Sequence, residues 1–255
     1  MTTSSPNAME PRCPVCSGSA MAPYGDKDGY SFLSCSDCGY VFCHPRPSQQ
    51  ALDEMHAEQG GSDGIRADYY PKAPSRARRG LMNAFKLVRY VFGQRVLDLG
   101  CGGGFVVCGF KRAFAREAVG LDINPNAIEY ARAHYSDCIF HCGTFDDFKD
   151  GRIGTFGFVY SSEVIEHVEN VEAYMNFLVE ITQPGAVVFI NTPDIAGEQV
   201  PDVVTDWDLF SPPLHIQFFN EDTLTRLFVR FGFTPIKRVP DRGGPGLKML
   251  FRKDA

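Results

Sequence analysis

The sequence predicts an α/β fold, in which a doubly wound, seven-stranded, mostly parallel sheet follows a small zinc-binding segment. Strand-like and helix-like patterns alternate from about residue 95 onward, glycines cluster directly after the first strand, and two C-x-x-C pairs stand near the N-terminus. We divide the chain into a disordered N-terminus (1–12), a zinc ribbon (13–48), a linker with a covering helix (49–94) and the main α/β domain (95–255).

Composition limits the classes of function. The chain has 255 residues, of which 44% are hydrophobic, so it can bury a proper core. Its net charge of −6 favours a small or neutral substrate over a polyanion. Residues 1–12 lack the basic and apolar regions of a signal peptide, and no apolar run is long enough to span a membrane. Together with an odd number of cysteines, nine, these features predict a cytoplasmic protein.

Four cysteines form the first motif. Cys13 and Cys16 are followed, after 18 residues, by Cys35 and Cys38. Two complete C-x-x-C knuckles can place four thiolates around one tetrahedral zinc, and we prefer this interpretation to two redox-active or incidental pairs. Four protein ligands leave no open position, so the predicted zinc is structural. The residues between the knuckles suggest a short hairpin that needs the metal for stability.

A helical pattern runs from about Ser75 to Phe92, with its apolar residues on one side. We expect this helix to pack beside the sheet and to cover the ligand site. Its several arginines are interpreted as a solvated helix face, in preference to an anion site.

The central motif is a strand at 96–99 that runs into a glycine-rich loop, with a helix expected from Phe105 to about Ala115. Glycine adopts positive φ easily and lets a ligand approach the backbone. The spacing does not match the dinucleotide fingerprint G-x-G-x-x-G, and the loop has neither the lysine nor the hydroxyl of a P-loop. An ordinary strand-to-helix turn is the alternative to a ligand-binding loop.

The remaining pattern, Asp98-x-Gly100-x-Gly102-x-Gly104, resembles motif I of the class I S-adenosylmethionine-dependent methyltransferases. The resemblance covers roughly two thirds of the chain. It implies a Rossmann-like fold and S-adenosylmethionine as the cofactor, with the loop under its methionine and ribose portions. This ligand carries a carboxylate, an ammonium and a sulfonium but no phosphate, which suits a loop without lysine.

The second strand, 118–122, ends in Asp122, where an acid can accept hydrogen bonds from ribose hydroxyls. Ile123 is expected beside the adenine. A helix should follow from 125 to 134, and either Asp122 or Asn124 can be its N-cap.

The third strand, 138–142, leads into Thr144 and Phe145. The resemblance implies that this turn contacts adenine through the backbone N–H of Phe145 and through a short polar side chain, Thr144 or Asp146.

After the fourth strand, 156–160, the run from Glu163 to Val168 reads E-V-I-E-H-V and resembles the ubiquinone-biosynthesis-type and related small-molecule methyltransferases. Ser161 and Glu163 should lie at the carboxyl edge of the sheet as cofactor contacts. Glu166 and His167 suggest an acid–base pair. Because adjacent helical residues point about 100° apart, we expect one of them to anchor the loop, with His167 retained as a catalytic candidate.

The remaining elements are a helix at 171–182, a strand at 186–191, a helix at 221–231 capped by Asn220, and two final strands from Gly232 and at 247–252. The segment 195–214 between them is rich in Asp and Pro, and the resemblance implies that it carries substrate contacts.

His215 is predicted at the mouth of the site as the general base, since imidazole titrates near neutrality and can take a proton from a hydroxyl. A histidine that orders the loop by hydrogen bonding is an equal alternative.

We therefore expect an S-adenosylmethionine-dependent methyltransferase that acts on a small molecule such as a sugar, a polyketide or another secondary metabolite. Methyl transfer should proceed by in-line displacement, with His215 as possible general base. One alternative is a ribosomal RNA methyltransferase that uses the zinc ribbon for RNA recognition, although the ribbon has no basic patch. Another is a non-catalytic partner protein that binds S-adenosylmethionine. The accepting atom (O, N or C) and the oligomeric state stay open.

Overall fold

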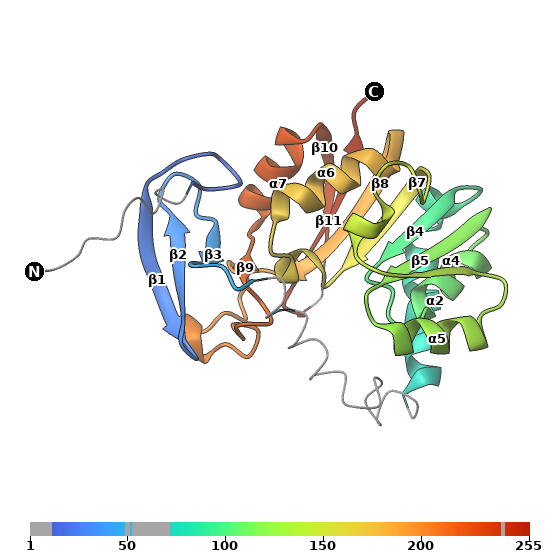
Figure 1. The fold of residues 1–255 in the computed structure, drawn as a ribbon, viewed down its shortest axis with the longest axis horizontal. Helices are drawn as coiled ribbons and strands as arrows, with labels where there is room; N and C mark the ends of the chain where they lie inside the picture. Colours follow the sequence, from blue (N-terminus) through green and yellow to red (C-terminus); the bar gives the residue numbers. More distant parts are fainter. Residues whose placement is uncertain (1–11, 49–51, 53–71, 241–242) are drawn as a thin grey trace, which may run out of the picture.

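The computed structural model describes residues 12–48, 52, 72–240 and 243–255 (Figure 1). It contains a seven-stranded sheet of order β10-β11-β8-β7-β4-β5-β6 and a four-stranded sheet of order β1-β2-β3-β9. The strands of the larger sheet are β4 Arg95–Leu99, β5 Glu117–Asp122, β6 Ile139–Cys142, β7 Phe156–Ser162, β8 Thr182–Pro193, β10 Phe233–Val239 and β11 Gly246–Lys253. The predicted disordered N-terminus, except Arg12, and residues 49–51 and 53–71 of the predicted linker lie outside the described residues.

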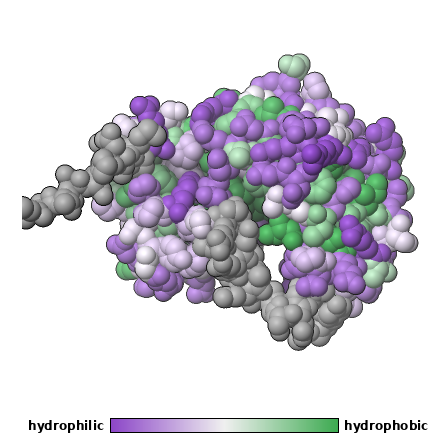
Figure 2. All heavy atoms as spheres, viewed as in Figure 1, coloured by the Kyte–Doolittle hydropathy of each residue, from purple (hydrophilic) through white to green (hydrophobic). Residues whose placement is uncertain are grey.

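The helices are α2 Ala73–Lys86, α3 Val88–Val91, α4 Phe105–Arg112, α5 Pro125–His134, α6 Val171–Ile181 and α7 Glu221–Arg230, with short 3-10 helices η1 Phe145–Phe148, η2 Ile165–His167 and η3 Val204–Asp206. Among the residues that the structure describes, no helix combines the length and the apolar character needed to cross a bilayer. Figure 2 shows hydrophobic residues gathered near the middle of one face, with hydrophilic residues around them.

The predicted doubly wound, mostly parallel sheet is confirmed. β4 pairs in parallel with both β5 and β7, and only β11 runs antiparallel to its neighbours β8 and β10. The chain leaves β4 in one direction along the sheet and β7 in the other. In open α/β sheets, the carboxyl ends of two such strands form the crevice in which ligands bind.

Both faces of the sheet are covered, which explains the continuous apolar character of its strands. In β7, Val159 packs in one hydrophobic cluster with α6 and α7, while Phe158 and Tyr160 pack in a second cluster with α2 to α5. The alternation follows from the two-residue repeat of a strand.

The helix predicted from Ser75 to Phe92 is divided into α2 and α3, with Leu87 between them. α2 packs directly on α4, because Gly80 and Gly109 let the two backbones meet. A Cβ built on Gly80 would lie 2.5 Å from the carbonyl oxygen of Phe105, and one built on Gly109 would lie 2.7 Å from that of Gly80. The helix therefore covers α4, and a role over the ligand site stays a prediction.

The small sheet combines three strands from the cysteine-rich segment with one strand from a distant part of the chain. The expected hairpin is β1 Met21–Lys27 with β2 Tyr30–Cys35, and it continues into β3 Val41–Cys43 and then into β9 Gln217–Phe218 (Figure 1). β9 comes from the segment that precedes α7, so the cysteine-rich segment completes its sheet with a distant part of the chain. Neither β3 nor β9 was predicted from the sequence, and the predicted domain limits stay predictions.

Candidate functional site

The loop after β4 has the backbone conformation that only glycine adopts readily. Gly100, Gly102 and Gly104 have φ values of +79°, +50° and +78°. A Cβ at Gly104 would lie 2.7 Å from the ring of Phe140, and one at Gly100 would collide with the side chain of Val164. Backbone conformation therefore favours glycine at all three positions, and packing adds a second reason at Gly100 and Gly104.

Asp122 ties this loop to the end of β5. Its Oδ2 accepts a hydrogen bond of 2.7 Å from the N–H of Gly102, and its Oδ1 accepts one of 2.9 Å from the N–H of Asn124. Asn124 is the N-cap of α5, since its Oδ1 accepts from the N–H groups of Asn126 and Ala127. The two possible caps are thus resolved: Asn124 caps the helix, and Asp122 supports the loop.

A second carboxylate, that of Asp98, lies near the end of β4, just before the loop. Asp98 is only 3% exposed, and its burial, together with the charge of Asp122, raises its pKa well above the usual value. Two nearby carboxylates repel each other, and a cationic ligand removes that cost. The ammonium and sulfonium of S-adenosylmethionine have the required charge, so the residues at this loop fit the cofactor.

The residues predicted to contact adenine differ in how exposed they are and in the contacts they already make. Ile123, beside Asp122, is 44% exposed, an unusual position for a large apolar side chain. Thr144 caps η1, and its hydroxyl donates to Asp147 Oδ2 at 2.9 Å. The ring of Phe145 packs against Phe177. Because these two side chains already have structural contacts, the adenine contacts of Thr144 and Phe145 stay predictions.

Ser161 and Glu163 lie at the carboxyl end of β7, as expected. The buried hydroxyl of Ser161 accepts from the hydroxyl of Tyr174 at 2.9 Å. Glu163 has a φ of +58°, a strained conformation for this residue type, and its Oε1 accepts from Asn191 Nδ2 at 2.6 Å. The roles of both residues in cofactor binding stay predictions.

Glu166, His167 and His215 form a compact group of potential ligands. One donor atom from each lies within 4.8 Å of the others, and the ring centroids of the two histidines are 4.8 Å apart. The expectation that Glu166 and His167 point away from each other is wrong, since His167 Nε2 lies 3.9 Å from Glu166 Oε1. Glu166 is fully buried and was not among the predicted site residues, although the E-x-x-E-H spacing was a usable signal.

Both histidines are anchored in the same way. Nδ1 of His167 lies 2.8 Å from the carbonyl oxygen of Leu214, and Nδ1 of His215 lies 2.6 Å from that of Leu209. A carbonyl only accepts, so Nδ1 carries the hydrogen and the lone pair of each neutral ring is on Nε2. His215 is 5% exposed rather than at an open mouth, and burial lowers its pKa. It therefore does order the loop, while its role as a base is untested.

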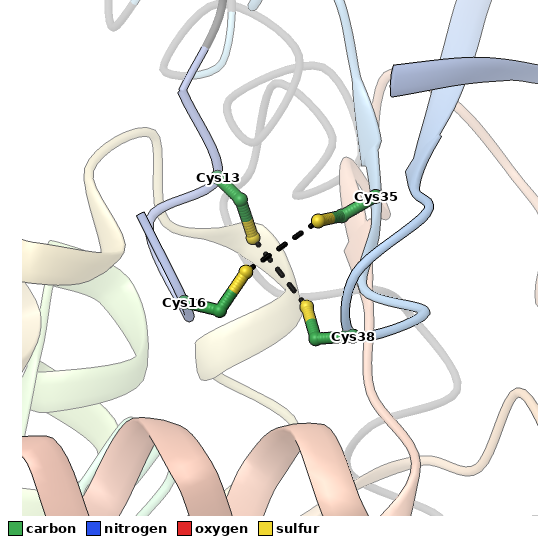
Figure 3. A group of neighbouring side chains, drawn as sticks. All are labelled: Cys13, Cys16, Cys35 and Cys38. Carbon is green, nitrogen blue, oxygen red and sulfur yellow. Dashed lines mark hydrogen bonds between the residues drawn. The ribbon is translucent and has the colours of Figure 1, made fainter. Parts of the chain in front are cut away.

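The four predicted zinc ligands converge (Figure 3). The Sγ atoms of Cys13 and Cys38 are 3.6 Å apart, and those of Cys16 and Cys35 are 3.5 Å apart. Tetrahedral zinc with Zn–S bonds of about 2.3 Å requires sulfur separations of about 3.8 Å. Burial raises the pKa of Cys13 to about 11, so a cation is what would hold this group as thiolates. The cluster fits a structural zinc.

A buried amide connects the cysteine-rich sheet to the loop that carries Glu166. Gln217, in β9, donates from Nε2 to the carbonyl oxygens of Ile165 and Val168 at 2.5 Å and 3.0 Å. Its Oε1 accepts from the hydroxyl of Tyr40 and, at 3.1 Å, from Arg46. This network was not predicted, because nothing in the spacing of these residues along the sequence marks them as partners.

Comparison with known proteins agrees with this geometry. A family model described as methyltransferase domain matches residues 64–238, well over half of the chain. The ubiquinone biosynthesis O-methyltransferase of Neisseria meningitidis serogroup C (strain 053442) is 28% identical over 143 residues, which cover 49% of this chain and 60% of that protein. The protein of the same name from Mesorhizobium japonicum is 31% identical over 104 residues, covering 39% and 41%. The chain thus spans 60% or less of the length of these relatives.

Two solved structures show the same fold. The 1,6-didemethyltoxoflavin-N1-methyltransferase of Burkholderia thailandensis has a TM-score of 0.58 at 16% identity, with 91% of this chain and 99% of that chain covered. The magnesium protoporphyrin IX methyltransferase of Synechocystis PCC 6803 has a TM-score of 0.55 at 15% identity, with 81% and 95% covered. Both were solved with bound S-adenosylhomocysteine.

Proposed function

The chain belongs to the class I S-adenosylmethionine-dependent methyltransferases, and on this premise we propose that it transfers the methyl group of S-adenosylmethionine to a small molecule. The observation that carries the proposal is the loop after β4, where three glycines adopt left-handed conformations and Asp122 accepts a hydrogen bond from the N–H of Gly102, close to the buried Asp98. The loop lies at the carboxyl ends of β4 and β7, where ligands bind in such sheets.

The proposed cofactor contacts follow the chain around this edge. Asp122 would accept from the ribose hydroxyls, since a carboxylate can accept several hydrogen bonds. Ile123 would lie against adenine, which accounts for its exposure, and the backbone N–H of Phe145 would reach the ring edge. Ser161 and Glu163 would border the methionine portion.

The chemistry asks little of the protein. The sulfonium is a good leaving group, so holding the acceptor in line with the S–CH3 bond supplies much of the rate. In transfer to a hydroxyl, the new bond forms between the acceptor oxygen and the methyl carbon, the C–S bond breaks, and the hydroxyl proton leaves. Nε2 of His215 is the proposed acceptor of that proton, because Nδ1 is held by Leu209.

The acceptor is proposed as a sugar, a polyketide or another secondary metabolite. The names of the relatives from Neisseria and Mesorhizobium support an oxygen acceptor. A cytoplasmic location is part of the same proposal.

Ribosomal RNA is the less favoured acceptor, since a net charge of −6 opposes binding to a polyanion. Measuring RNA affinity at several salt concentrations distinguishes an RNA acceptor from a small-molecule acceptor. Tight binding that weakens steeply with salt would favour RNA over a small molecule.

Calorimetric titration of the zinc-loaded protein with S-adenosylmethionine and S-adenosylhomocysteine tests the cofactor site. Both should bind at one site per chain, and Asp122→Ala should weaken binding by roughly 10- to 100-fold, as for a lost hydrogen bond to a charged group. Asp137→Ala, an exposed acid before β6, is the matched control and should bind normally. A folded wild-type protein that binds neither compound would refute the proposal.

A further inference from the structure

We propose that a hollow on α2 binds the phosphate group of a phosphorylated small-molecule acceptor. The hollow has a volume of about 550 Å³, and its lining includes Arg78, Arg79, Met82, Asn83 and Lys86. Small-molecule sites commonly have volumes of about 300–1,000 Å³. That the ligand is the methyl acceptor rests on the proposed function, whereas the binding of phosphate does not.

The charge of this part of the chain is the first observation. Residues 72–97 include seven lysines and arginines and no aspartate or glutamate, although the chain as a whole has a net charge of −6. Three of the seven, Arg78, Arg79 and Lys86, line the hollow. Among the described residues, none of these three side chains forms an ion pair with a carboxylate. Their charges repel one another, and an anionic ligand would remove that cost.

The lining residues lie on a face of α2 that packing does not use. Gly80 and Ala84 are the buried residues of this helix, and Gly80 faces α4. Residues three or four apart on a helix are neighbours, which brings Met82 between Arg78, Arg79 and Lys86. Met82 is 51% exposed and offers an apolar contact to the uncharged part of a ligand.

Asn83 connects the hollow to the ligand edge of the sheet. Its side chain is hydrogen bonded to the hydroxyl of Tyr160, which also interacts with Ser162. Tyr160 pairs with Asp98 in the register of β7 and β4, and Ser162 is the last residue of β7. The hollow therefore adjoins the carboxyl ends of these two strands, where open α/β sheets bind ligands. Sequence alone favoured a solvated face for the arginines, and this position favours an anion site.

The hollow is also close to the glycine loop without being part of it. Gly80 lies against the carbonyl oxygen of Phe105, the residue at which α4 begins after the loop. If the proposed function holds, the phosphate would anchor the acceptor in the hollow while its reacting group extends past Asn83 toward the cofactor. Binding of a part that does not react then supplies the orientation that in-line transfer needs.

A phosphate suits this hollow better than a carboxylate does. A phosphate ester carries up to about two negative charges on three acceptor oxygens, and arginine can bind it through two parallel hydrogen bonds. A long polyanion is less favoured. Because residues 72–97 are basic and the whole chain is acidic, the rest of the surface would repel nucleic acid beyond the hollow.

Phenyl phosphate is a suitable probe, because it joins a phosphate to an apolar ring. The zinc-loaded full-length protein is titrated calorimetrically in phosphate-free buffer with about 0.15 M NaCl, which screens weak surface binding. We expect one site per chain. The double variant Arg78→Gln/Arg79→Gln should raise the Kd at least tenfold, as for lost hydrogen bonds between charged groups. Arg112→Gln/Arg116→Gln removes the same charge from exposed positions at and after the end of α4 and should bind normally.

Two further titrations identify the ligand group and the site. Benzoate, which replaces the phosphate by a carboxylate, should bind at least tenfold more weakly than phenyl phosphate. Phenyl phosphate should still bind when S-adenosylhomocysteine is present at saturation, since the hollow lies beside the glycine loop. Its displacement by S-adenosylhomocysteine would place the anion in the loop and overturn the proposal.

Three other results would also overturn it: no saturable binding of phenyl phosphate, unchanged binding by a folded Arg78→Gln/Arg79→Gln protein, or benzoate binding as tight as that of phenyl phosphate. An RNA oligonucleotide that binds more tightly than phenyl phosphate, and loses affinity in the same double variant, would assign the arginines to nucleic acid instead. Phenyl phosphate is titrated without cofactor, so a protein that fails to bind S-adenosylhomocysteine would refute the proposed function and leave the phosphate site to be judged by itself.

Discussion

Single residues of the glycine loop hold the backbone in a shape that side chains resist. Gly104 combines a φ of +78° with a Cβ direction blocked by Phe140 and Ala131. Gly151 has a similar φ, +73°, but open space around its Cβ position. Because the two glycines have similar φ values, comparing alanine substitutions at both positions separates the cost of backbone strain from the cost of steric crowding.

Gly104→Ala should lower the free energy of unfolding by about 2–4 kcal/mol, the sum of about 1 kcal/mol for the left-handed backbone and about 1–3 kcal/mol for overpacking. Gly151→Ala should show only the first part. Chemical denaturation measures both. Equal losses in the two variants would show that Phe140 moves aside freely and that the tight packing does not constrain the loop.

Asp98 makes stability depend on pH. Since burial and the charge of Asp122 raise the pKa of Asp98 in the folded protein well above its ordinary value, the folded protein holds this proton more tightly than the unfolded chain. The resulting stabilisation is fully present below about pH 4 and is lost as pH rises through the folded pKa.

Asp98→Asn keeps a neutral side chain at every pH. Its free energy of unfolding, relative to wild type, should therefore increase from about pH 4 upward and level off above the folded pKa of Asp98. Urea denaturation across this pH range measures the difference, with Asp137→Asn as the exposed control. If the stability of Asp98→Asn changed with pH in parallel with that of wild type, burial of the ionised Asp98 would not destabilise the folded protein.

Elements with strong local signals could be predicted from the sequence, and short ones that depend on tertiary contacts could not. α5 begins and ends where expected, at Pro125 and His134, because Asn124 caps it and proline suits its first turn. β9 has only two residues, Gln217 and Phe218, and exists because β3 pairs with it. β3 and β9 are more than 170 residues apart in the sequence, so no local pattern contains both strands.

The same limit applies to the site. The glycine loop and Asp122 lie within one βαβ unit, so spacing was enough to mark them. The meeting of Glu166 with His215 depends on the path of residues 168–214, which local patterns do not specify. Adjacent positions in a short 3-10 turn also do not follow the α-helical geometry from which we expected Glu166 and His167 to diverge.

Gln217 is the contact between the small sheet and the η2 loop. Gln217→Leu would leave the carbonyl oxygens of Ile165 and Val168 and the hydroxyl of Tyr40 without this partner. Since each buried unsatisfied group costs about 1–3 kcal/mol, we expect a loss of at least about 3 kcal/mol in the free energy of unfolding.

Gln183→Leu, at an exposed position, is the control for Gln217→Leu and should change stability by less than about 0.5 kcal/mol. Hydrogen exchange adds the location of the effect. Faster exchange in Gln217→Leu should appear at residues 163–168 as well as in β3. Exchange that changed only in β3 would show that the amide does not connect the two regions.

At the scale of the whole molecule, the cysteine-rich segment and the larger sheet share one core. The main hydrophobic cluster contains Cys13, Val15 and Tyr40 as well as Val159 of β7 and Phe228 of α7. A third cluster joins Phe32 of β2 to Phe210 and to Phe218 of β9. Such shared burial implies that the two parts unfold together, because neither can expose its side of the cluster alone.

Scanning calorimetry should therefore show one unfolding transition for the zinc-loaded protein. Removing zinc with a chelator should lower the temperature of the whole transition, since metal affinity is part of the folding free energy. Saturating S-adenosylhomocysteine, at about 100 times its Kd, should add about 2.7 kcal/mol and raise Tm by roughly 5–10 °C. A separate transition at lower temperature, sensitive to the chelator but not to S-adenosylhomocysteine, would show that the cysteine-rich segment unfolds independently. The hydrogen bonds of Gln217 would then not couple zinc binding to the ligand-binding edge of the larger sheet.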